Sequence, residues 1–237
     1  MQARQGTAAE EPEHKGSRVD TGSPLLMPLG ERALVVRFAD RLEISANRAA
    51  VALARALDQA VIAGVQEVAP NLVSVLVRYD PKLISYDALC GEVRLALAGS
   101  NTRGREEGRS HALAIRYGGA DGPDFDVVAQ ALDLTADEFV ALHTATPLRV
   151  LAVGFAPGFL YAGMHAANLV LPRRESVRGQ VPPGSVLFAA GQTAIAATTL
   201  PTGWSVIGRT KFINFDPIAT PPVHIVAGDT IVFERQQ

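Results

Sequence analysis

LRVLAVGFAPGFLY, residues 148–161, joins an apolar run to a loop of glycine, proline and aromatic residues. Residues 148–153 are apolar apart from Arg149, and Gly154, Pro157 and Gly158 follow directly. Glycine and proline end regular structure, because glycine readily adopts a positive φ and proline lacks a backbone N–H. The stretch therefore predicts a short buried strand followed by a turn.

The same pattern recurs as far as the C-terminus, where short apolar runs alternate with glycine and proline. Many short strands joined by such turns are typical of a β-barrel or a β-sandwich. The expected elements are a strand at 111–117, a helix at 124–132, a capping box from Thr135 to Glu138, and strands at 148–153, 185–190, 194–197, 204–207, 212–215, 223–226 and 230–233. The second half of the chain is therefore predicted to be mostly β.

The first half has the pattern of a small α+β unit. Strand-forming residues come first, and apolar residues then recur at helical spacing from Ile44 to Val61. The expected elements are a strand at 33–38, a helix at 44–61, strands at 65–69 and 72–77 with a turn at Pro70-Asn71, and a helix at 86–98. This order favours helices packed on a mostly antiparallel sheet.

The composition divides the chain into two domains. Residues 99–110 contain no aliphatic side chain, and a polar, glycine-rich stretch between patterned segments is typical of a linker. Residues 1–24 are weakly hydrophobic and are expected to form a flexible tail. The predicted domains are thus an α+β domain at 25–98 and a mostly-β domain at 111–237.

The 237-residue chain, with 48% apolar and 19% charged residues, has the composition of an ordinary globular protein. Its one cysteine, Cys90, cannot form an internal disulfide, and the polar N-terminus lacks the pattern of a secretion signal. No stretch approaches the roughly 18 consecutive apolar residues of a membrane-spanning helix. We therefore expect a cytoplasmic protein with no membrane partner.

The formal net charge of −2 is unevenly distributed. Residues 1–146 hold 15 Lys/Arg against 20 Asp/Glu, whereas residues 147–237 hold 7 against 4. A mildly basic second half suits a small anionic ligand, but a nucleic-acid-binding protein would need a clustered basic surface. We expect a small-molecule substrate and no nucleic acid.

Three familiar site signatures are absent or imperfect. The five histidines show no metal-site spacing, so no metal site is predicted, and no Gly-x-Ser-x-Gly nucleophile motif occurs. Residues 203–210, GWSVIGRT, have the spacing of a phosphate-binding P-loop with Arg in place of Lys. However, the intervening side chains are bulky, and residues 211–215 are expected to continue as a strand where a P-loop needs a helix.

Three other groups of residues are candidates for a binding site. Phe155, Phe159 and Tyr161 surround Pro157 and Gly158, and these aromatic side chains can either line a pocket or plug the end of the barrel.

Downstream, Arg173, Arg174 and Arg178 are suited to a bidentate grip on a carboxylate or phosphate, although a solvated position is favoured for Arg174. Gln192 and Thr193 form either a core pair or a hydrogen-bonding pair at the barrel mouth.

Taken in order, the motifs of the second domain resemble the B-subunit family of 5-oxoprolinase, whose relatives include allophanate hydrolase subunit 1 and Kip-type kinase inhibitors. They are residues 117–119 (YGG), 122–124 (GPD), 154–161 (GFAPGFLY), 171–174 (LPRR), 181–186 (VPPGSV), 192–193 (QT), 203–204 (GW), 207–210 (IGRT), 215–217 (FDP) and 227–229 (AGD). The resemblance covers the whole second domain, and the first domain is compatible with it from about Leu29.

The resemblance implies a ferredoxin-like α+β domain followed by a cyclophilin-like β-barrel. It also implies one component of an enzyme that opens the 5-oxoproline ring to glutamate at the expense of ATP, with Mg as the counter-ion of ATP. Members of the family pair with a homologue of the C subunit, and a separate A subunit completes the reaction. Phosphorylating the amide oxygen would make a leaving group, and cationic residues would stabilise the developing charge.

On this basis we expect a site at the mouth of the barrel, with Arg173, Arg209 and Gln192 as its catalytic residues. The expected substrate-binding residues are Phe155, Pro157, Gly158, Phe159, Tyr161, Arg178, Thr193, Gly208 and Thr210.

Several positions depart from the family pattern. Ala120 stands where Glu is usual, Leu187 and Ala190 replace small residues, and Ala196-Ala197 replace a Tyr-Pro element. Three functions therefore stay open: an oxoprolinase component, an allophanate hydrolase or urea-pathway component, and a non-catalytic inhibitor of a sensor histidine kinase. A neighbouring gene for a C-subunit homologue would favour the enzymes, and a neighbouring sensor kinase gene would favour the inhibitor.

Limited proteolysis tests the predicted linker. Trypsin should cut first after Arg103, Arg105 or Arg109, because exposed polar segments between domains are the preferred sites of nicking. Mass spectrometry of the first fragments identifies the bond that is cut. Early cleavage within residues 150–210 would contradict the boundary.

Overall fold

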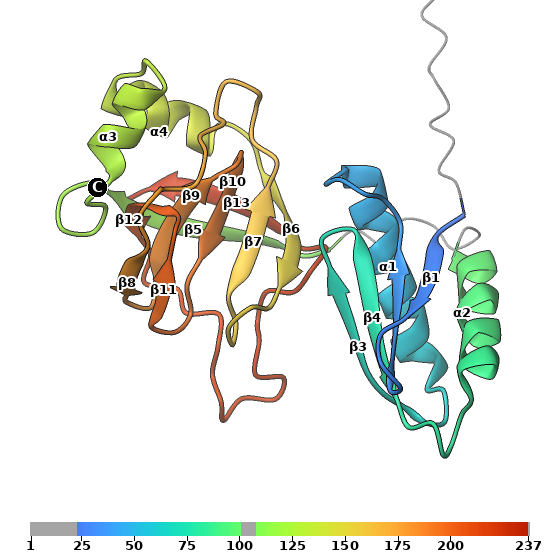
Figure 1. Ribbon diagram of the computed structural model, residues 1–237. Coiled ribbons are helices and arrows are strands. Elements are labelled where there is room, and N and C mark those ends of the chain that lie inside the picture. The colour runs from blue at the N-terminus through green and yellow to red at the C-terminus, as the bar shows by residue number, and fades with distance from the viewer. Residues whose placement is uncertain (1–22, 101–107, 237) are drawn as a thin grey trace, which may run out of the picture.

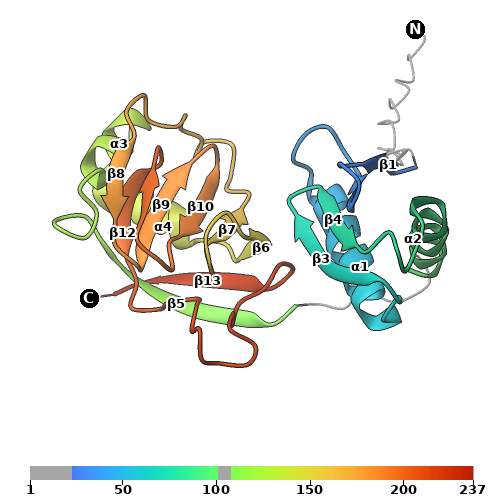
Figure 2. The ribbon, with the colours of Figure 1, turned by 60° about the horizontal axis from the view of Figure 1, so that its bottom comes forward.

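Residues 23–100 and 108–236 are described by the computed structural model, so most of the predicted tail and linker, residues 1–22 and 101–107, lie outside the described residues. Two units lie side by side: a four-stranded sheet with two helices, and a closed barrel of seven strands with two further helices (Figure 1, Figure 2). The barrel expected from the second half of the sequence is confirmed. Among the described helices, none is long and apolar enough to cross a membrane.

The first unit is an antiparallel sheet in the order β1-β2-β4-β3, with both helices packed on the same face. Its elements are β1 (Leu25–Pro28), β2 (Ala33–Arg37), α1 (Ile44–Ala60), β3 (Val65–Asn71), β4 (Ser74–Tyr79) and α2 (Tyr86–Ser100). Leu53 and Leu57 of α1 pack in one buried cluster with Leu34 and Val77 of the sheet. The helix predicted at 44–61 is confirmed as α1. The helical spacing of its apolar residues places these side chains on one face.

The prediction that the hairpin turns at Pro70-Asn71 is wrong. Pro70 and Asn71 pair with Val75 and Ser74 inside the β3–β4 ladder, and the chain turns after them at Leu72, whose φ is +39°. Proline is tolerated in β3 because this strand lies at the edge of the sheet, where its missing N–H breaks no ladder bond. The short strand β1 was not expected, and α2 continues through residues 99–100 of the predicted linker.

The second unit closes its strands in the order β10-β7-β6-β13-β5-β12-β9. These strands are β5 (Ser110–Tyr117), β6 (Leu148–Val153), β7 (Leu160–Gly163), β9 (Ser185–Ala189), β10 (Gln192–Ile195), β12 (Ser205–Arg209) and β13 (Thr230–Arg235). A separate two-stranded sheet is formed by β8 (Arg178–Val181) and β11 (Leu200–Thr202), and the helices are α3 (Phe125–Ala131) and α4 (Ala136–Thr144). The predicted capping box of α4 is confirmed by reciprocal hydrogen bonds between Thr135 and Glu138.

The apolar side chains of the barrel fall into two clusters. One fills the interior and includes Leu160, Val186, Phe188, Ile195 and Ile207, together with Phe125 and Phe139 of the helices. The other lies on the outer wall and includes Phe159, Leu187, Ala189, Ala194, Trp204 and Val206. The division follows from strand geometry, because successive side chains point to opposite faces.

Residues 212–215 and 223–226, both expected to be strands, instead belong to a long irregular segment between β12 and β13. Asn214 is fully buried in this segment, and its amide nitrogen donates to the carbonyl oxygens of Gly158 and Ile225, at 3.2 and 3.0 Å. Its side-chain oxygen accepts from the Ile225 N–H at 2.8 Å. One side chain thus satisfies backbone groups that a strand ladder would otherwise pair.

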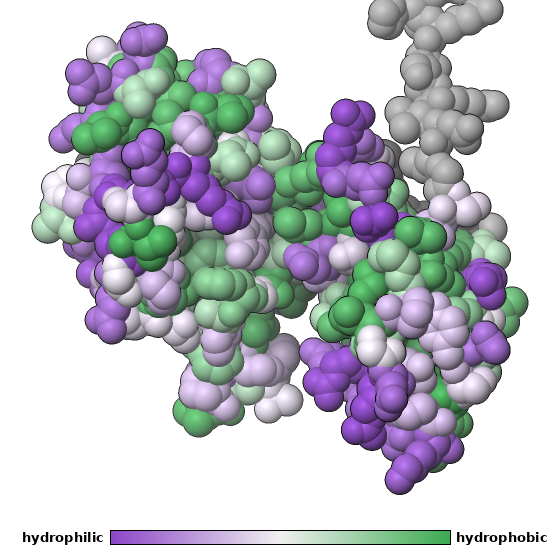
Figure 3. All heavy atoms as spheres, in the orientation of Figure 1, coloured by the Kyte–Doolittle hydropathy of each residue, from purple (hydrophilic) through white to green (hydrophobic). Residues whose placement is uncertain are grey.

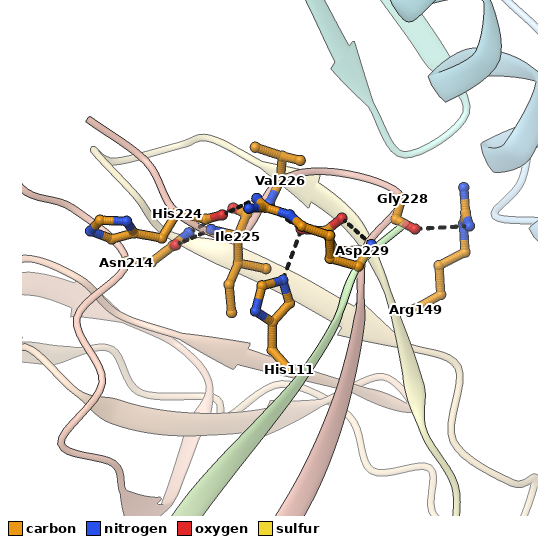
Figure 4. Close-up of polar contacts among 9 residues, drawn as sticks. His111, Arg149, Asn214, His224, Ile225, Val226, Gly228 and Asp229 are labelled. Carbon is orange, nitrogen blue, oxygen red and sulfur yellow. Dashed lines mark hydrogen bonds and ion pairs between the residues drawn. The ribbon is translucent and has the colours of Figure 1, made fainter. Parts of the chain in front are cut away.

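Asp229 anchors the beginning of β5 to the end of this segment (Figure 4). Its carboxylate accepts from the Arg109 N–H at 3.0 Å and the Val226 N–H at 3.2 Å, and lies 3.0 Å from Nε2 of His111. The Arg109 guanidinium donates to the His224 carbonyl oxygen at 2.6 Å. The chain that enters the barrel from the linker is therefore fixed from Arg109 onward.

A buried asparagine joins the two units. Asn47 of α1 donates from its amide nitrogen to the carbonyl oxygens of Leu72, at 2.6 Å, and Leu151 in the barrel, at 2.7 Å. Its side-chain oxygen accepts from Nε of Arg149 at 2.9 Å, and Nη1 of Arg149 donates to the Gly228 carbonyl oxygen at 3.2 Å. In the space-filling view the units meet along a narrow waist, with a furrow below it (Figure 3). Asn47 is the polar centre of this contact.

Asn47→Ala tests the junction. The change should lower the free energy of unfolding by about 1–3 kcal/mol, because it leaves buried polar groups on both units unpaired. Urea unfolding measures the loss. Ser45→Ala, at an exposed position of the same helix, is the control and should change stability by no more than about 0.5 kcal/mol. Equal stability of Asn47→Ala and the wild type would show that the contact contributes nothing.

Candidate functional site

The outer wall of the barrel carries a row of residues in register on four strands. Tyr161 of β7 pairs with Ala194, Ala194 with Leu187, and Leu187 with Val206. Leu187, Ala194 and Val206 belong to the outer cluster, and Tyr161 packs against it. The row therefore faces away from the barrel interior.

Aromatic rings form a continuous ladder along this wall. Centroid distances are 5.6 Å from Phe155 to Phe159, 4.9 Å from Phe159 to Tyr161 and 5.9 Å from Tyr161 to Trp204. The Arg173 guanidinium carbon lies 5.8 Å from the Trp204 ring centroid, within the range of a cation–π contact. The ladder thus runs from an exposed aromatic ring to an exposed cation.

Backbone geometry fixes the exposed end of the ladder. Phe155 is 77% exposed and has a φ of +77°, which is unusual for a bulky side chain. Gly158 has a φ of +65°, and a Cβ there would meet the Asn214 carbonyl oxygen at 2.7 Å. With Pro157 between them, these residues form a turn held against the Asn214 segment. The turn presents the Phe155 ring outward.

Charge and burial act together on Tyr161. Burial raises the pKa of this phenol, and the Arg173 cation offsets part of the increase. Tyr161 is therefore a neutral hydrogen-bond donor at pH 7.

Arg174 and Arg178 converge on Asp124, a residue that sequence reasoning did not single out as functional. Nη1 of Arg174 and Nη2 of Arg178 both donate to Oδ1 of Asp124, at 2.5 and 2.8 Å. Arg174 is therefore ion-paired and half-buried rather than solvated. Arg178, expected to bind substrate, has Nη2 of its guanidinium engaged in an ion pair with Asp124.

Arg209, Gly208 and Thr210 lie at the end of β12. Nη2 of Arg209 donates to the Pro183 carbonyl oxygen at 3.2 Å, and Nη1 lies 3.9 Å from Oδ1 of Asp121, one position after Ala120. Thr210 is buried and its hydroxyl accepts from the Phe212 N–H, while Gly208 packs so tightly against Arg116 that a Cβ has no room. Residues 205–209 are a strand and residues 211–215 are irregular, so this segment is not a P-loop.

The structure separates the expected pair Gln192 and Thr193. Thr193 is fully buried and points into the barrel, so the neighbouring side chain of Gln192 faces the opposite side. Gln192 also begins β10, whereas the aromatic turn lies beside Ile195 at the other end of that strand. Oε1 of Gln192 is buried without a hydrogen-bond partner among the described residues.

Thr193 belongs to a buried chain of polar groups. Its hydroxyl lies 2.8 Å from Nε2 of His143 and 2.8 Å from Nε2 of His165, and Nδ1 of His143 lies 2.8 Å from the Tyr117 hydroxyl. A hydroxyl carries one proton, so at least one imidazole must donate to Thr193. The sequence holds no signal for this chain, because its members are far apart and each sits in an apolar segment.

Burial keeps both imidazoles neutral. It lowers the pKa of His143 well below the ordinary value, aided by His165, and lowers the pKa of His165 to about 4. Within residues 23–100 and 108–236, no group of three or more His, Cys, Asp or Glu residues is placed to hold a metal ion. The polar chain is linked by hydrogen bonds inside the barrel, and the outer wall carries Arg173 over the Trp204 ring.

The neutral histidines should make the protein acid-sensitive. Below the unfolded pKa of about 6.5 the unfolded chain binds protons that the folded chain does not, so stability falls as the pH falls. With a folded pKa of about 4, His165 alone should contribute a loss of about 2 kcal/mol between pH 6.5 and pH 5. Urea unfolding at these pH values measures it.

Two variants isolate this contribution. His165→Gln should reduce the loss, whereas His224→Gln, at an exposed position, should leave it unchanged. A wild-type stability that is flat from pH 6.5 to 5 would show that the buried histidines titrate normally.

Comparisons with known proteins identify the family. Residues 24–225 match the family described as carboxyltransferase domain, subdomain C and D. The B subunit of 5-oxoprolinase from Bacillus subtilis (strain 168) is 31% identical over 87% of this chain and 90% of its own length. The B subunit of 5-oxoprolinase from Escherichia coli O157:H7 is 32% identical over 88% of this chain and 94% of its own length.

Solved structures show the same fold. A crystal structure of TTHA0988 is 31% identical with a TM-score of 0.76 over 87% of this chain, and this chain spans only 40% of it. The protein PH0987 from Pyrococcus horikoshii is 32% identical with a TM-score of 0.52, over 90% of this chain and 98% of its own.

The urea amidolyase of K. lactis shares the fold with a TM-score of 0.72 at 15% identity, over 90% of this chain and 15% of its own. The matches at more than 30% identity to two named B subunits, over 87% and 88% of this chain, decide the assignment. This chain belongs to the B-subunit family of 5-oxoprolinase.

Proposed function

We propose that this chain is the B subunit of a cytoplasmic, ATP-dependent 5-oxoprolinase that acts with a C-subunit homologue and an A subunit. The proposal rests on the similarity, over most of the chain, to proteins named as the B subunit of 5-oxoprolinase. As part of the same proposal, the first unit is a ferredoxin-like domain and the second is a cyclophilin-like barrel.

The outer wall suits the proposed substrate. 5-Oxoproline is a flat five-membered ring with one carboxylate. The exposed Phe155 and the half-buried Tyr161 offer an apolar surface for such a ring, and Arg173, which lies over the buried Trp204 ring, offers a cation for the carboxylate. Phe159 is buried beneath this surface and packs against both Phe155 and Tyr161.

The chemistry requires a second cation. In the proposed reaction, ATP transfers its terminal phosphoryl group to the amide oxygen and ADP leaves. A first water then adds to the ring carbon and the ring C–N bond breaks to release the amine as an acyl phosphate. A second water displaces phosphate from this acyl phosphate to give glutamate. Charge develops on the transferred group, where a preorganised cation stabilises the transition state. Arg209 is the residue we propose for this role, because its guanidinium is fixed by the Pro183 carbonyl oxygen and remains partly exposed. Mg would accompany ATP.

Reconstitution tests the function. The chain is co-expressed with its C-subunit homologue, and the complex is supplied with the A subunit, ATP and 5-oxoproline. Glutamate release that depends on ATP and on all three proteins is expected. Ammonia release from allophanate, without turnover of 5-oxoproline, would instead support the urea-pathway alternative. A complex without either activity would overturn an enzymatic role.

Arginine variants of the reconstituted complex test the site. Arg173→Ala and Arg209→Ala should each lower kcat/KM by about 30- to 1,000-fold, equivalent to about 2–4 kcal/mol, the scale expected for removing a preorganised charged donor. Arg235→Ala is the control, because Arg235 pairs with Asp137 at the exposed surface. Thermal unfolding shows whether each variant is folded. Full activity of both site variants would end the site assignment.

A further inference from the structure

The loop that carries Arg173 is held by a residue from a distant part of the chain. Asp124 precedes α3 and is 7% exposed. Its Oδ1 accepts from Arg174 and Arg178, and its Oδ2 accepts from the Val206 N–H at 2.8 Å. One carboxylate thus ties two arginines of the loop to strand β12.

A backbone contact fixes the same loop beside Trp204. The Arg174 N–H donates to the carbonyl oxygen of Gly203 at 2.7 Å. Arg173 directly precedes the anchored Arg174, and Trp204 directly follows Gly203. Both partners of the cation–π contact are therefore next to anchored residues.

We propose that Asp124 is a positioning residue, which holds the 173–178 loop so that the Arg173 guanidinium lies over Trp204 and faces an anionic substrate. Only the last step, the substrate, rests on the proposed function. The placement of Arg173 stands on the contacts themselves.

Charge makes the loop dependent on Asp124. Arg174 and Arg178 direct two guanidinium groups at one carboxylate, and their Nε atoms are buried without acceptors among the described residues. Without the carboxylate, two like charges would remain close together and half-buried, which is unfavourable. The loop relieves this by moving into solvent, and Arg173 moves with it.

The chain contains one tryptophan, so its fluorescence reports on this contact without interference. Trp204 is 7% exposed, and Arg173 covers part of the ring. Arg173→Ala should therefore shift the emission to longer wavelength and raise the acrylamide quenching constant by about twofold. Asp124→Asn should produce the same change although Arg173 is still present.

Three further variants separate positioning from general support of the fold. Arg174→Ala combined with Arg178→Ala removes the ties between the loop and Asp124 while leaving the bond from Val206 to Asp124, and should reproduce the fluorescence change. The acrylamide quenching constant of Asp124→Asn combined with Arg173→Ala should be no higher than that of Arg173→Ala alone. Asp137→Asn, which changes a carboxylate whose side chain is 82% exposed and pairs with Arg235, is the matched control and should resemble the wild type.

The reconstituted complex supplies a second readout. Asp124→Asn should raise the KM for 5-oxoproline by about tenfold or more with a smaller change in kcat, as expected when binding geometry is lost. Wild-type Trp204 fluorescence in folded Asp124→Asn and in the folded double arginine variant would overturn the positioning role. An altered fluorescence in both, with a wild-type complex that lacks oxoprolinase activity, would support the positioning role and contradict the proposed function.

Discussion

Each strand of the barrel serves two environments, because its side chains alternate between a closed interior and an outer wall. Phe188 and Ile195 fill the interior, while Leu187 and Ala194, their neighbours in sequence, form part of the outer cluster. The outer cluster is itself buried, and the exposed residues beside it are Phe155 and Arg173, at the two ends of the aromatic ladder. This constraint also explains why Gln192 and Thr193, adjacent in sequence, cannot act together.

The segments between the strands are ordered by a few buried polar side chains. Asn214 joins the segment before β13 to the aromatic turn, Asp229 joins that segment to the start of β5, and Asn47 joins the barrel to α1. Each satisfies several backbone groups at once, which a buried irregular segment requires. The outer-wall site likewise depends on a buried polar side chain with several partners, since Asp124 bonds Arg174 in the loop of Arg173.

The regular elements were predictable where the sequence carries a strong period or a capping pattern. The α1 helix has one apolar face, and α4 begins with a capping box. Residues 212–215 and 223–226 are apolar enough for strands, but Asn214 takes over the backbone groups that a ladder would pair. Short strands such as β7 and β8 lack a signal of their own, because each pairs only through the tertiary structure.

The candidate site could be predicted only in part, for a physical reason. The aromatic residues can be recognised because they stand among Gly and Pro at a strand end, and the arginines by their spacing. Asp124 lies about 50 positions from the arginines, in a segment that a sequence shows only as the start of a helix. The motifs at 122–124, 171–174 and 203–204 nevertheless lie in one hydrogen-bond network. The Arg174 side chain donates to Asp124, and the Arg174 N–H donates to the Gly203 carbonyl oxygen. Motifs that are separate in sequence thus form one network of contacts around the loop that places Arg173 over the Trp204 ring.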